Sequence, residues 1–357
     1  MKELMQSLCD KAKKQGADFA DIRIYSSEST SILRQDEKAD KLSQSNNIGI
    51  GVRVLKDHSW GFASASSFDK DVSQDLVDWA INMASASKGK TEEAIITEPD
   101  VVNDIVSAKV EIDPRSVSIE DKIKKLEEFE KAAIDTAGNK LENIMHNYVD
   151  NISKEIICNS YGTYIETETI RTIVLTHIVV SDGRSRQRGY VRLGKPIGFE
   201  LLENINIEDF SVKAANKAIR LLSADMPPAG KFPVIFHPSI TGLLTHEALG
   251  HNAEADSVLN NTSIIGDKLN QKIASELINI IDDSTYPNKW GTYKYDSEGT
   301  MGEKRVIVEN GILKGFLHSL ETSARMGVKP NGSARASGYS SIPIVRMSNT
   351  YIAPGTS

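Results

Sequence analysis

The stretch NNIGIGVRVLKDHSWGFASAS, residues 46–66, alternates apolar with small or polar side chains on both sides of the triplet Lys56-Asp57-His58. Alternation with a period of two is typical of a β-strand with two different faces. Two such strands joined by a short polar segment predict an antiparallel hairpin. The runs ADIRIYSS and STSILRQ, which come before this hairpin, predict two further strands.

Helical patterns stand on both sides of these strands. Residues 2–15 have a helical spacing of apolar side chains and stop at Gly16. Asp69 stands where the N-cap of a second helix, residues 71–87, would lie. The apolar stripe predicted for this second helix consists of Val72, Leu76, Trp79, Ala80 and Met83. Helix, antiparallel strands and helix together predict one compact α+β unit over residues 1–87.

The same order of elements occurs a second time. Residues 88–117 are polar and predict a connector that can pack as an extended strand. Ser118 begins another helix–strands–helix pattern, which predicts a second α+β unit over residues 118–225. The paired prolines of MPPAGKF mark the next boundary, and VIFHPS after them predicts a strand. The predicted fold class is α+β, with repeated helix and antiparallel-sheet units before a mostly β C-terminal domain, residues 226–357, that carries a motif helix.

The composition excludes several classes of protein. The 357 residues carry a formal net charge of −7, which argues against a direct nucleic-acid partner. No run reaches the roughly 18 apolar residues of a transmembrane helix, so no membrane partner is expected. The only two cysteines, Cys9 and Cys158, exclude a disulfide framework and fit a reducing compartment. We therefore expect a cytoplasmic protein.

The residues that carry chemistry gather in THEALGHNAEAD, residues 245–256. In the zinc-peptidase motif H-E-x-x-H the histidines are four residues apart, about 40° around a helix, so both imidazoles reach one ion. His246 and His251 are five residues apart, and a regular helix would turn them about 140° from each other. A π-bulge, or an end of the helix at Gly250, would bring the rings back together. Gly250 suits either because glycine tolerates backbone angles that other residues avoid.

The acidic residues of this stretch suggest complementary roles. Glu247 stands where zinc peptidases have their general base. Glu254 is a candidate to orient the ring of His251 or to bind metal itself, and Asp256 is a weaker supporting candidate. The apolar approach ITGLL predicts a buried helix, in which unpaired histidines and carboxylates would be costly. The alternative is a helix with two surface histidines, and the residues alone leave both interpretations open.

HEALGHNAEAD resembles the H-E-A-x-G-H-x-x-E-G-D signature of the TldD/PmbA family of zinc metallopeptidases, in its motif-bearing TldD-like branch. The runs GIGVRVLKDHSWGFAS, DDSTYPNKWGTYKYDSEG, ENGILKGFLHS and PIVRMSNTYIAPG resemble further blocks of this family, in the family's order. The resemblance covers essentially the whole chain. It implies a zinc-dependent peptidase that hydrolyses unfolded or extended peptides, with residues 226–357 as its metallopeptidase domain.

Carried over by position, the resemblance implies that His246 and His251 bind Zn²⁺ and that Glu247 activates the water. Glu254 matches the acidic residue that follows the ligands. Ala255 replaces the usual glycine, and Asp-Ser-Glu-Gly at 296–299 departs from Asp-Asp-Glu-Gly. The resemblance also implies a dimer, formed by identical chains or with a sister subunit that lacks the motif.

A third ligand is implied as well, a cysteine in a Cys-Gly block beyond the Arg-Met-x-Asn-Thr motif. The chain reaches Ser357 soon after that motif, and neither cysteine matches the family's. The domain is therefore expected to be truncated at its C-terminus, or the site to be incomplete. Cys158 is a candidate substitute, with a buried strand cysteine as the alternative. Catalytic competence stays open for this reason, and the competing function is a non-catalytic scaffold or partner-binding subunit of a peptidase complex.

Overall fold

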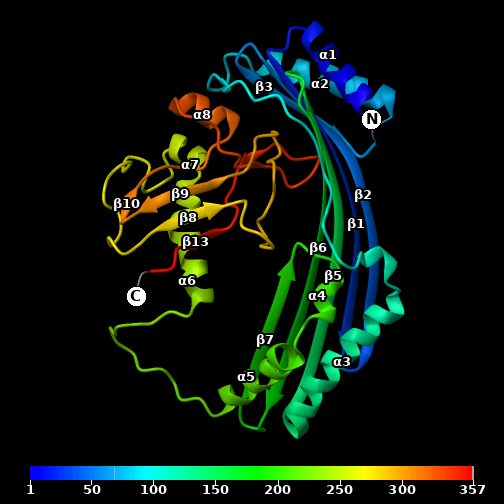
Figure 1. Ribbon diagram of the computed structural model, residues 1–357, viewed down its shortest axis with the longest axis vertical. Coiled ribbons are helices and arrows are strands. Elements are labelled where there is room, and N and C mark those ends of the chain that lie inside the picture. Colours follow the sequence, from blue (N-terminus) through cyan, green and yellow to red (C-terminus); the bar gives the residue numbers. More distant parts are fainter. Residues whose placement is uncertain (68, 356–357) are drawn as a thin grey trace.

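A long, curved sheet of seven strands dominates the computed structural model, which describes residues 1–67 and 69–355 (Figure 1). The strand order is β3-β2-β1-β5-β6-β4, and β7 pairs with β6. Only the pairing of β4 with β6 is parallel among these described strands. The strands are β1 (Phe19–Gln35), β2 (Lys38–Lys56), β3 (Ser59–Ala65), β4 (Asn103–Val106), β5 (Leu141–Asn159), β6 (Tyr164–Ser181) and β7 (Arg186–Lys195).

The hairpin predicted from residues 46–66 is confirmed as β2 and β3. Asp57 and His58 adopt left-handed φ angles of 50° and 59°, as in the two-residue turns whose twist matches antiparallel strands. The two strands predicted before it are one strand, β1, which pairs with β2 and with β5. The β1–β5 pairing joins the first two predicted units into one sheet, and the division at residues 88 and 118 stays a prediction. The extended strand expected in the connector is β4.

The two faces of this sheet differ in chemistry because side chains alternate along a strand. At the two ends of the sheet, even-numbered residues of β1, β5 and β6 form apolar surfaces that helices cover. Odd-numbered residues, among them Asp21, Glu155 and Arg171, form a polar face. The C-terminal unit packs against this polar face (Figure 1).

Five α-helices accompany the sheet. The predicted caps are confirmed, since the side chain of Asp69 accepts the N–H of Val72 and that of Ser118 accepts the N–H of Asp121. The helices are α1 (Lys2–Lys14), α2 (Lys70–Ser87), α3 (Ile119–Ala137), α4 (Glu200–Glu203) and α5 (Lys213–Leu222), with a π-helical turn at Glu208–Val212 and 3₁₀ turns at Pro114–Ser116 and Gly138–Lys140.

The apolar stripe predicted for α2 is wrong in part. Trp79 and Met83 are 55% and 51% exposed, whereas Leu76 and Ala80 are buried. The helix lies so close to β3 that a Cβ atom at Gly61 would be 1.9 Å from the carbonyl oxygen of Ala80. Only small side chains fit this contact, so the buried face is centred on alanines and the two largest side chains lie outside it.

The C-terminal unit is built from short elements around its own apolar core. A four-stranded antiparallel sheet has the order β10-β9-β8-β13, and β11 pairs with β12. The strands are β8 (Ile280–Asp283), β9 (Lys304–Glu309), β10 (Ile312–Leu313), β11 (Ala334–Arg335), β12 (Ile344–Val345) and β13 (Thr350–Ile352). The α-helices are α6 (Pro238–Thr245), α7 (Ala255–Leu259) and α8 (Leu320–Met326).

The strand predicted for VIFHPS is wrong. Residues 231–237 form no strand, and Ile235 is 100% exposed. Helix α6, which follows, was expected to be buried, but Leu243 and Leu244 are 56% and 46% exposed. Figure 1 shows this segment swinging away from the lower end of the long sheet before it enters α6. An apolar pattern does not reveal whether a neighbour is present to cover it.

A buried ion network holds the C-terminal unit against the sheet. The guanidinium of Arg53 lies 2.5 Å from Asp21 and 2.9 Å from Glu298. The second carboxylate oxygen of Glu298 accepts the N–H of Leu320 at 2.8 Å. Asp296 accepts N–H groups from its own loop and from Ala334. Glu298 therefore has partners on both sides of this contact, whereas the partners of Asp296 lie within the C-terminal unit.

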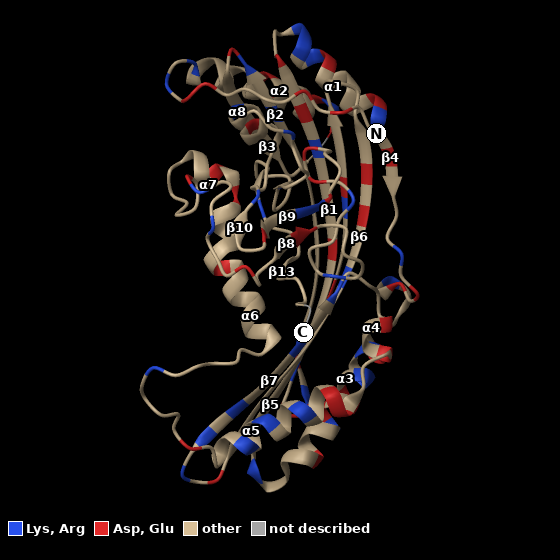
Figure 2. Ribbon diagram, turned by 60° about the vertical axis from the view of Figure 1, so that its left-hand side comes forward, with Lys and Arg blue, Asp and Glu red and all other residues tan. Residues whose placement is uncertain are grey.

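Within the described residues, no helix is both long and apolar enough to cross a bilayer. The basic run of residues 181–192 forms the end of β6, the turn and the first part of β7, in a largely exposed hairpin. Figure 2 shows the Lys and Arg positions spread along β7 at the lower end of the sheet.

Candidate metal centre

The helix that carries the motif changes its turn at the first histidine. α6 ends at Thr245, a π-helical turn spans His246–Gly250, and a 3₁₀ turn spans His251–Ala253. This confirms the prediction that the helix is irregular between Glu247 and His251. The wider π turn absorbs the extra residue, and the ring centres of His246 and His251 lie 4.8 Å apart with their planes at 83°.

The role predicted for Gly250 is wrong. Its φ and ψ are −55° and −52°, ordinary right-handed helical values that any residue adopts. A Cβ atom at this position would lie 1.9 Å from Sδ of Met347, a buried residue of the C-terminal core. The position therefore needs glycine for space, because the segment before β13 packs directly against the turn.

The carboxylate of Glu254 lies beside Nδ1 of His251. Glu254 is buried, and its oxygens lie 3.3 Å from Nδ1 of His251. Arg346 lies on the other side of this carboxylate, with Nη1 at 3.3 Å. A carboxylate that accepts the Nδ1–H fixes the imidazole's orientation and leaves Nε2 for a metal.

The backbone after the histidines is anchored by the block ENGILKGFLHS. Leu317 donates its N–H to the carbonyl of Ala253 at 2.8 Å, and its carbonyl accepts the N–H of Ala255 at 3.0 Å. This short parallel bridge holds Glu254 in extended conformation between the 3₁₀ turn and α7. Asp256 accepts the N–H of Ser257 at 2.8 Å, a contact within its own helix start.

The histidines face open space. His246 and Glu247 are exposed, and a cavity of about 580 Å³ lies beside His246. Its other walls include Tyr286, Lys289 and the residues of β13. β13 is the edge strand of its sheet, with β8 as its partner within the described residues. A main-chain edge therefore lies across this cavity from His246.

The arrangement fits two of the donor positions of a zinc site. Two imidazoles bound to one tetrahedral zinc at about 2.0–2.1 Å have ring centres about 5 Å apart, close to the 4.8 Å observed. No group of three His, Cys, Asp or Glu side chains poised for a metal occurs in residues 1–67 and 69–355. Cys158 lies on the apolar face of the long sheet, with its Sγ 4.0 Å from that of Cys9 under α1. That is the face opposite the C-terminal unit.

Sequence reasoning missed two residues of this centre, Arg346 and Met347. Both belong to the run PIVRMSNTYIAPG, which carried a family resemblance but no assigned role. Arg346 lies 92 positions beyond Glu254 in the chain, and the histidines are farther still. No periodicity in one sequence links positions this distant.

Similarity to known proteins extends over the whole chain. Residues 20–84, 112–222 and 229–357 match the domains described as PmbA/TldA metallopeptidase domain 1, central domain and C-terminal domain. A protein from Methanocaldococcus jannaschii named a metalloprotease is 40% identical over 95% of this chain and 74% of its own. A protein from Saccharolobus solfataricus named a zinc metalloprotease TldD homolog is 30% identical over 97% of this chain and 74% of its own.

The fold itself has solved counterparts. The crystal structure of TldE from Thermococcus kodakarensis gives a TM-score of 0.80 at 19% identity, covering 99% of this chain and 78% of that one. A crystal structure from Thermotoga maritima gives 0.83 at 22% identity, covering 99% and 77%. At these identities the likeness establishes the fold, and the predicted α+β class is confirmed.

Proposed function

Because the chain belongs to the PmbA/TldD family of metallopeptidases, we propose that it is a zinc-dependent peptidase that hydrolyses unfolded or extended peptides. The observation that carries this proposal is the π-helical turn at His246–Gly250, which keeps the rings of His246 and His251 4.8 Å apart. The names of the relatives support the reaction class and the metal.

The residues of the turn divide the chemistry among them. His246 and His251 would hold zinc, which when bound supplies a Lewis acid for the scissile carbonyl and lowers the pKa of water. Glu247, next to the first ligand and exposed, is proposed as the general base that takes a proton from the attacking water. Glu254 would keep His251 oriented by accepting its Nδ1–H.

The free edge of β13 supports an extended substrate. A peptide that adds to a sheet edge pairs through its main chain, so this mode places little demand on side chains. The cavity beside His246 lies against β13, which would bring the main chain of such a peptide to the histidines. A folded protein presents few free strands, which is why we propose unfolded or extended peptides.

A non-catalytic scaffold is the second candidate. Among the described residues two histidines, and no group of three donors, form the candidate centre, and the measurements of metal and cleavage below decide between the two candidates. In either case we infer a cytoplasmic dimer, of identical chains or with a sister subunit that lacks the motif. Sedimentation of the purified protein, alone and with that subunit, tests the assembly.

Metal content and peptide cleavage together test the function. We expect His246→Ala and His251→Ala to lose bound zinc, whereas His177→Gln on β6 keeps it. Glu247→Gln should keep zinc and lose about 10²–10⁴-fold in cleavage of an unfolded peptide. The control, Glu276→Gln at an exposed position, should keep both zinc and cleavage. Full zinc retention in both histidine variants would refute the ligand assignment. Zinc binding without any cleavage by the parent chain would favour the scaffold.

A further inference from the structure

A second cavity lies between the polar face of the long sheet and the C-terminal unit. Its volume of about 540 Å³ is in the range of small-ligand sites. One wall consists of odd-numbered residues of β1, β5 and β6, and the opposite wall comes from the segments around β11 and β12. We name it the arginine cavity because Arg171, Arg335 and Arg346 line it.

Arg171 and Arg335 have no carboxylate partner among the residues that the structure describes. In residues 1–67 and 69–355, neither guanidinium forms an ion pair, and the Nε atom of each is buried without a hydrogen bond. They lie over aromatic rings, Arg171 at 5.5 Å from the centre of Trp290 and Arg335 at 5.7 Å from that of Tyr293. Burial and the positive charge of Arg335 lower the pKa of Arg171. Two like charges thus share one partly buried space.

The fully buried arginines, unlike the half-buried Arg171 and Arg335, have carboxylates near them, although for Arg23 the nearest, Asp21, is 3.8 Å away. Arg34 lies 2.8 Å from Glu130, and Arg305 lies 2.7 Å from Asp282. Arg53 contacts two carboxylates, as described above. Because a charge that is partly removed from water is costly without a counter-charge, such a pair favours the binding of an anion.

The acidic residues that line the arginine cavity do not supply a counter-charge for Arg171 and Arg335. Asp296 accepts the N–H groups of Glu298, Thr300 and Ala334, which occupy its oxygens. Burial raises the pKa of Glu155, which disfavours its charged form. The cavity therefore presents free guanidinium donors among neutral or already bonded groups.

Arg346 links the arginine cavity to the candidate metal centre. Arg346 lines the cavity and also contacts Glu254, which holds His251. The same segment then enters β13, whose residues line the cavity beside His246. Arg346 and Thr350 are four positions apart in the chain, with bends at Ser348 and Asn349, so they lie at most about 13 Å apart at roughly 3.3 Å per residue. An extended peptide of a few residues can therefore reach both places.

We propose that the arginine cavity binds a carboxylate of the peptide substrate through Arg171 and Arg335. This inference rests on the proposed peptidase function, and it implies a preference for peptides that carry a carboxylate at a suitable position. Guanidinium groups match the planar pair of carboxylate oxygens and hold it by charge-assisted hydrogen bonds. The carboxylate belongs either to the C-terminus of the peptide or to an acidic side chain.

Binding without cleavage tests the inference. The protein is the full chain with Glu247→Gln, and the probe is an octapeptide without charged side chains, labelled at its N-terminus and followed by fluorescence anisotropy. It is used with a free C-terminus, as the C-terminal amide, and as the amide with one glutamate. We expect a carboxylate-bearing form to bind about 10–100-fold more tightly than the plain amide. Tighter binding of the free acid would identify the C-terminal carboxylate as the bound group, and tighter binding of the glutamate peptide would identify an acidic side chain.

The arginine variants assign this preference to the cavity. Arg171→Gln and Arg335→Gln should abolish it while leaving affinity for the plain amide unchanged, and Arg335→Lys should retain part of it. Arg188→Gln on the exposed β7 is the matched control. Equal binding of all three peptides, or a preference that survives both glutamine substitutions, contradicts the inference. The inference is also contradicted if the protein binds inorganic phosphate but none of the carboxylate-bearing peptides. Cleavage by the parent chain is measured separately, so a failed peptidase and a failed carboxylate site give different results.

Discussion

Replacing Gly250 by alanine probes the contact that fixes the histidine turn. The new Cβ would lie 1.9 Å from Sδ of Met347, so this buried side chain must move. Overpacking of this kind costs about 1–3 kcal/mol. Alanine is favoured over glycine in a helix by about 1 kcal/mol, which offsets part of that cost. We expect Gly250→Ala to lower the free energy of unfolding by about 1–2 kcal/mol.

Gly242 in α6 is the matched control, because a Cβ there meets nothing within 4 Å. Gly242→Ala should raise the free energy of unfolding by about 0.5–1 kcal/mol. Urea unfolding followed by circular dichroism measures both variants, with equal m-values as the check that the same transition is compared. In a Met347→Ala background the cost of Gly250→Ala should disappear. If both glycine variants are stabilised alike, the contact with Met347 does not fix the turn, and the explanation given for Gly250 is wrong.

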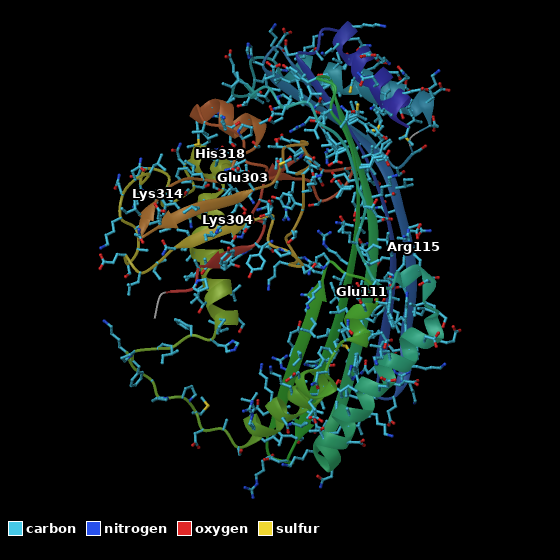
Figure 3. All side chains as sticks on the ribbon, in the orientation of Figure 1. Glu111, Arg115, Glu303, Lys304, Lys314 and His318 are labelled. Atoms are coloured by element: carbon cyan, nitrogen blue, oxygen red, sulfur yellow. The ribbon has the colours of Figure 1, made fainter. Side chains whose placement is uncertain are left out.

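Three further predictions concern the buried side chains of Glu254, Glu298 and His318. Glu254→Gln should weaken zinc binding about 10–100-fold, because His251 loses the carboxylate that orients it; unchanged affinity in a competition titration would count against that role. Glu298→Ala should destabilise the protein by about 3–5 kcal/mol by leaving Arg53 partly uncompensated, and a loss below that of an ordinary surface substitution would show that the ion network is dispensable. Burial lowers the pKa of His318, marked in Figure 3, from 6.5 to about 4. Between these pH values the unfolded chain binds a proton that the folded protein does not, so stability should fall by about 3 kcal/mol as the pH drops from 6.5 to 4. His318→Gln should reduce this slope, and an unchanged pH profile would exclude His318 as its source.

Local signals in the sequence specify much of the fold. The alternating run around Lys56-Asp57-His58 predicts the hairpin, and Asp69 and Ser118 predict the starts of α2 and α3. The five-residue spacing of His246 and His251 predicts an irregular turn, because a regular helix cannot bring the rings together. These features depend on residues that are neighbours in the chain.

Features that depend on distant partners were missed. Helix α6 is apolar but exposed, since burial requires a covering neighbour that a pattern does not reveal. The face that α2 buries is set by its close approach to Gly61, not by its largest side chains. Met347 and Arg346 meet the histidine turn only through tertiary folding. The arginine cavity is formed in the same way, by strands of the long sheet and loops of the C-terminal unit.

The central claim is that the π-helical turn brings His246 and His251 to one metal ion. A crystal of the protein soaked with zinc, with anomalous diffraction measured on both sides of the zinc absorption edge, tests it most directly. The account predicts one anomalous peak about 2.0–2.1 Å from a ring nitrogen of each histidine, with Glu254 still beside Nδ1 of His251. A peak bound to only one of the two rings, or zinc found only elsewhere on the protein, would contradict the claim.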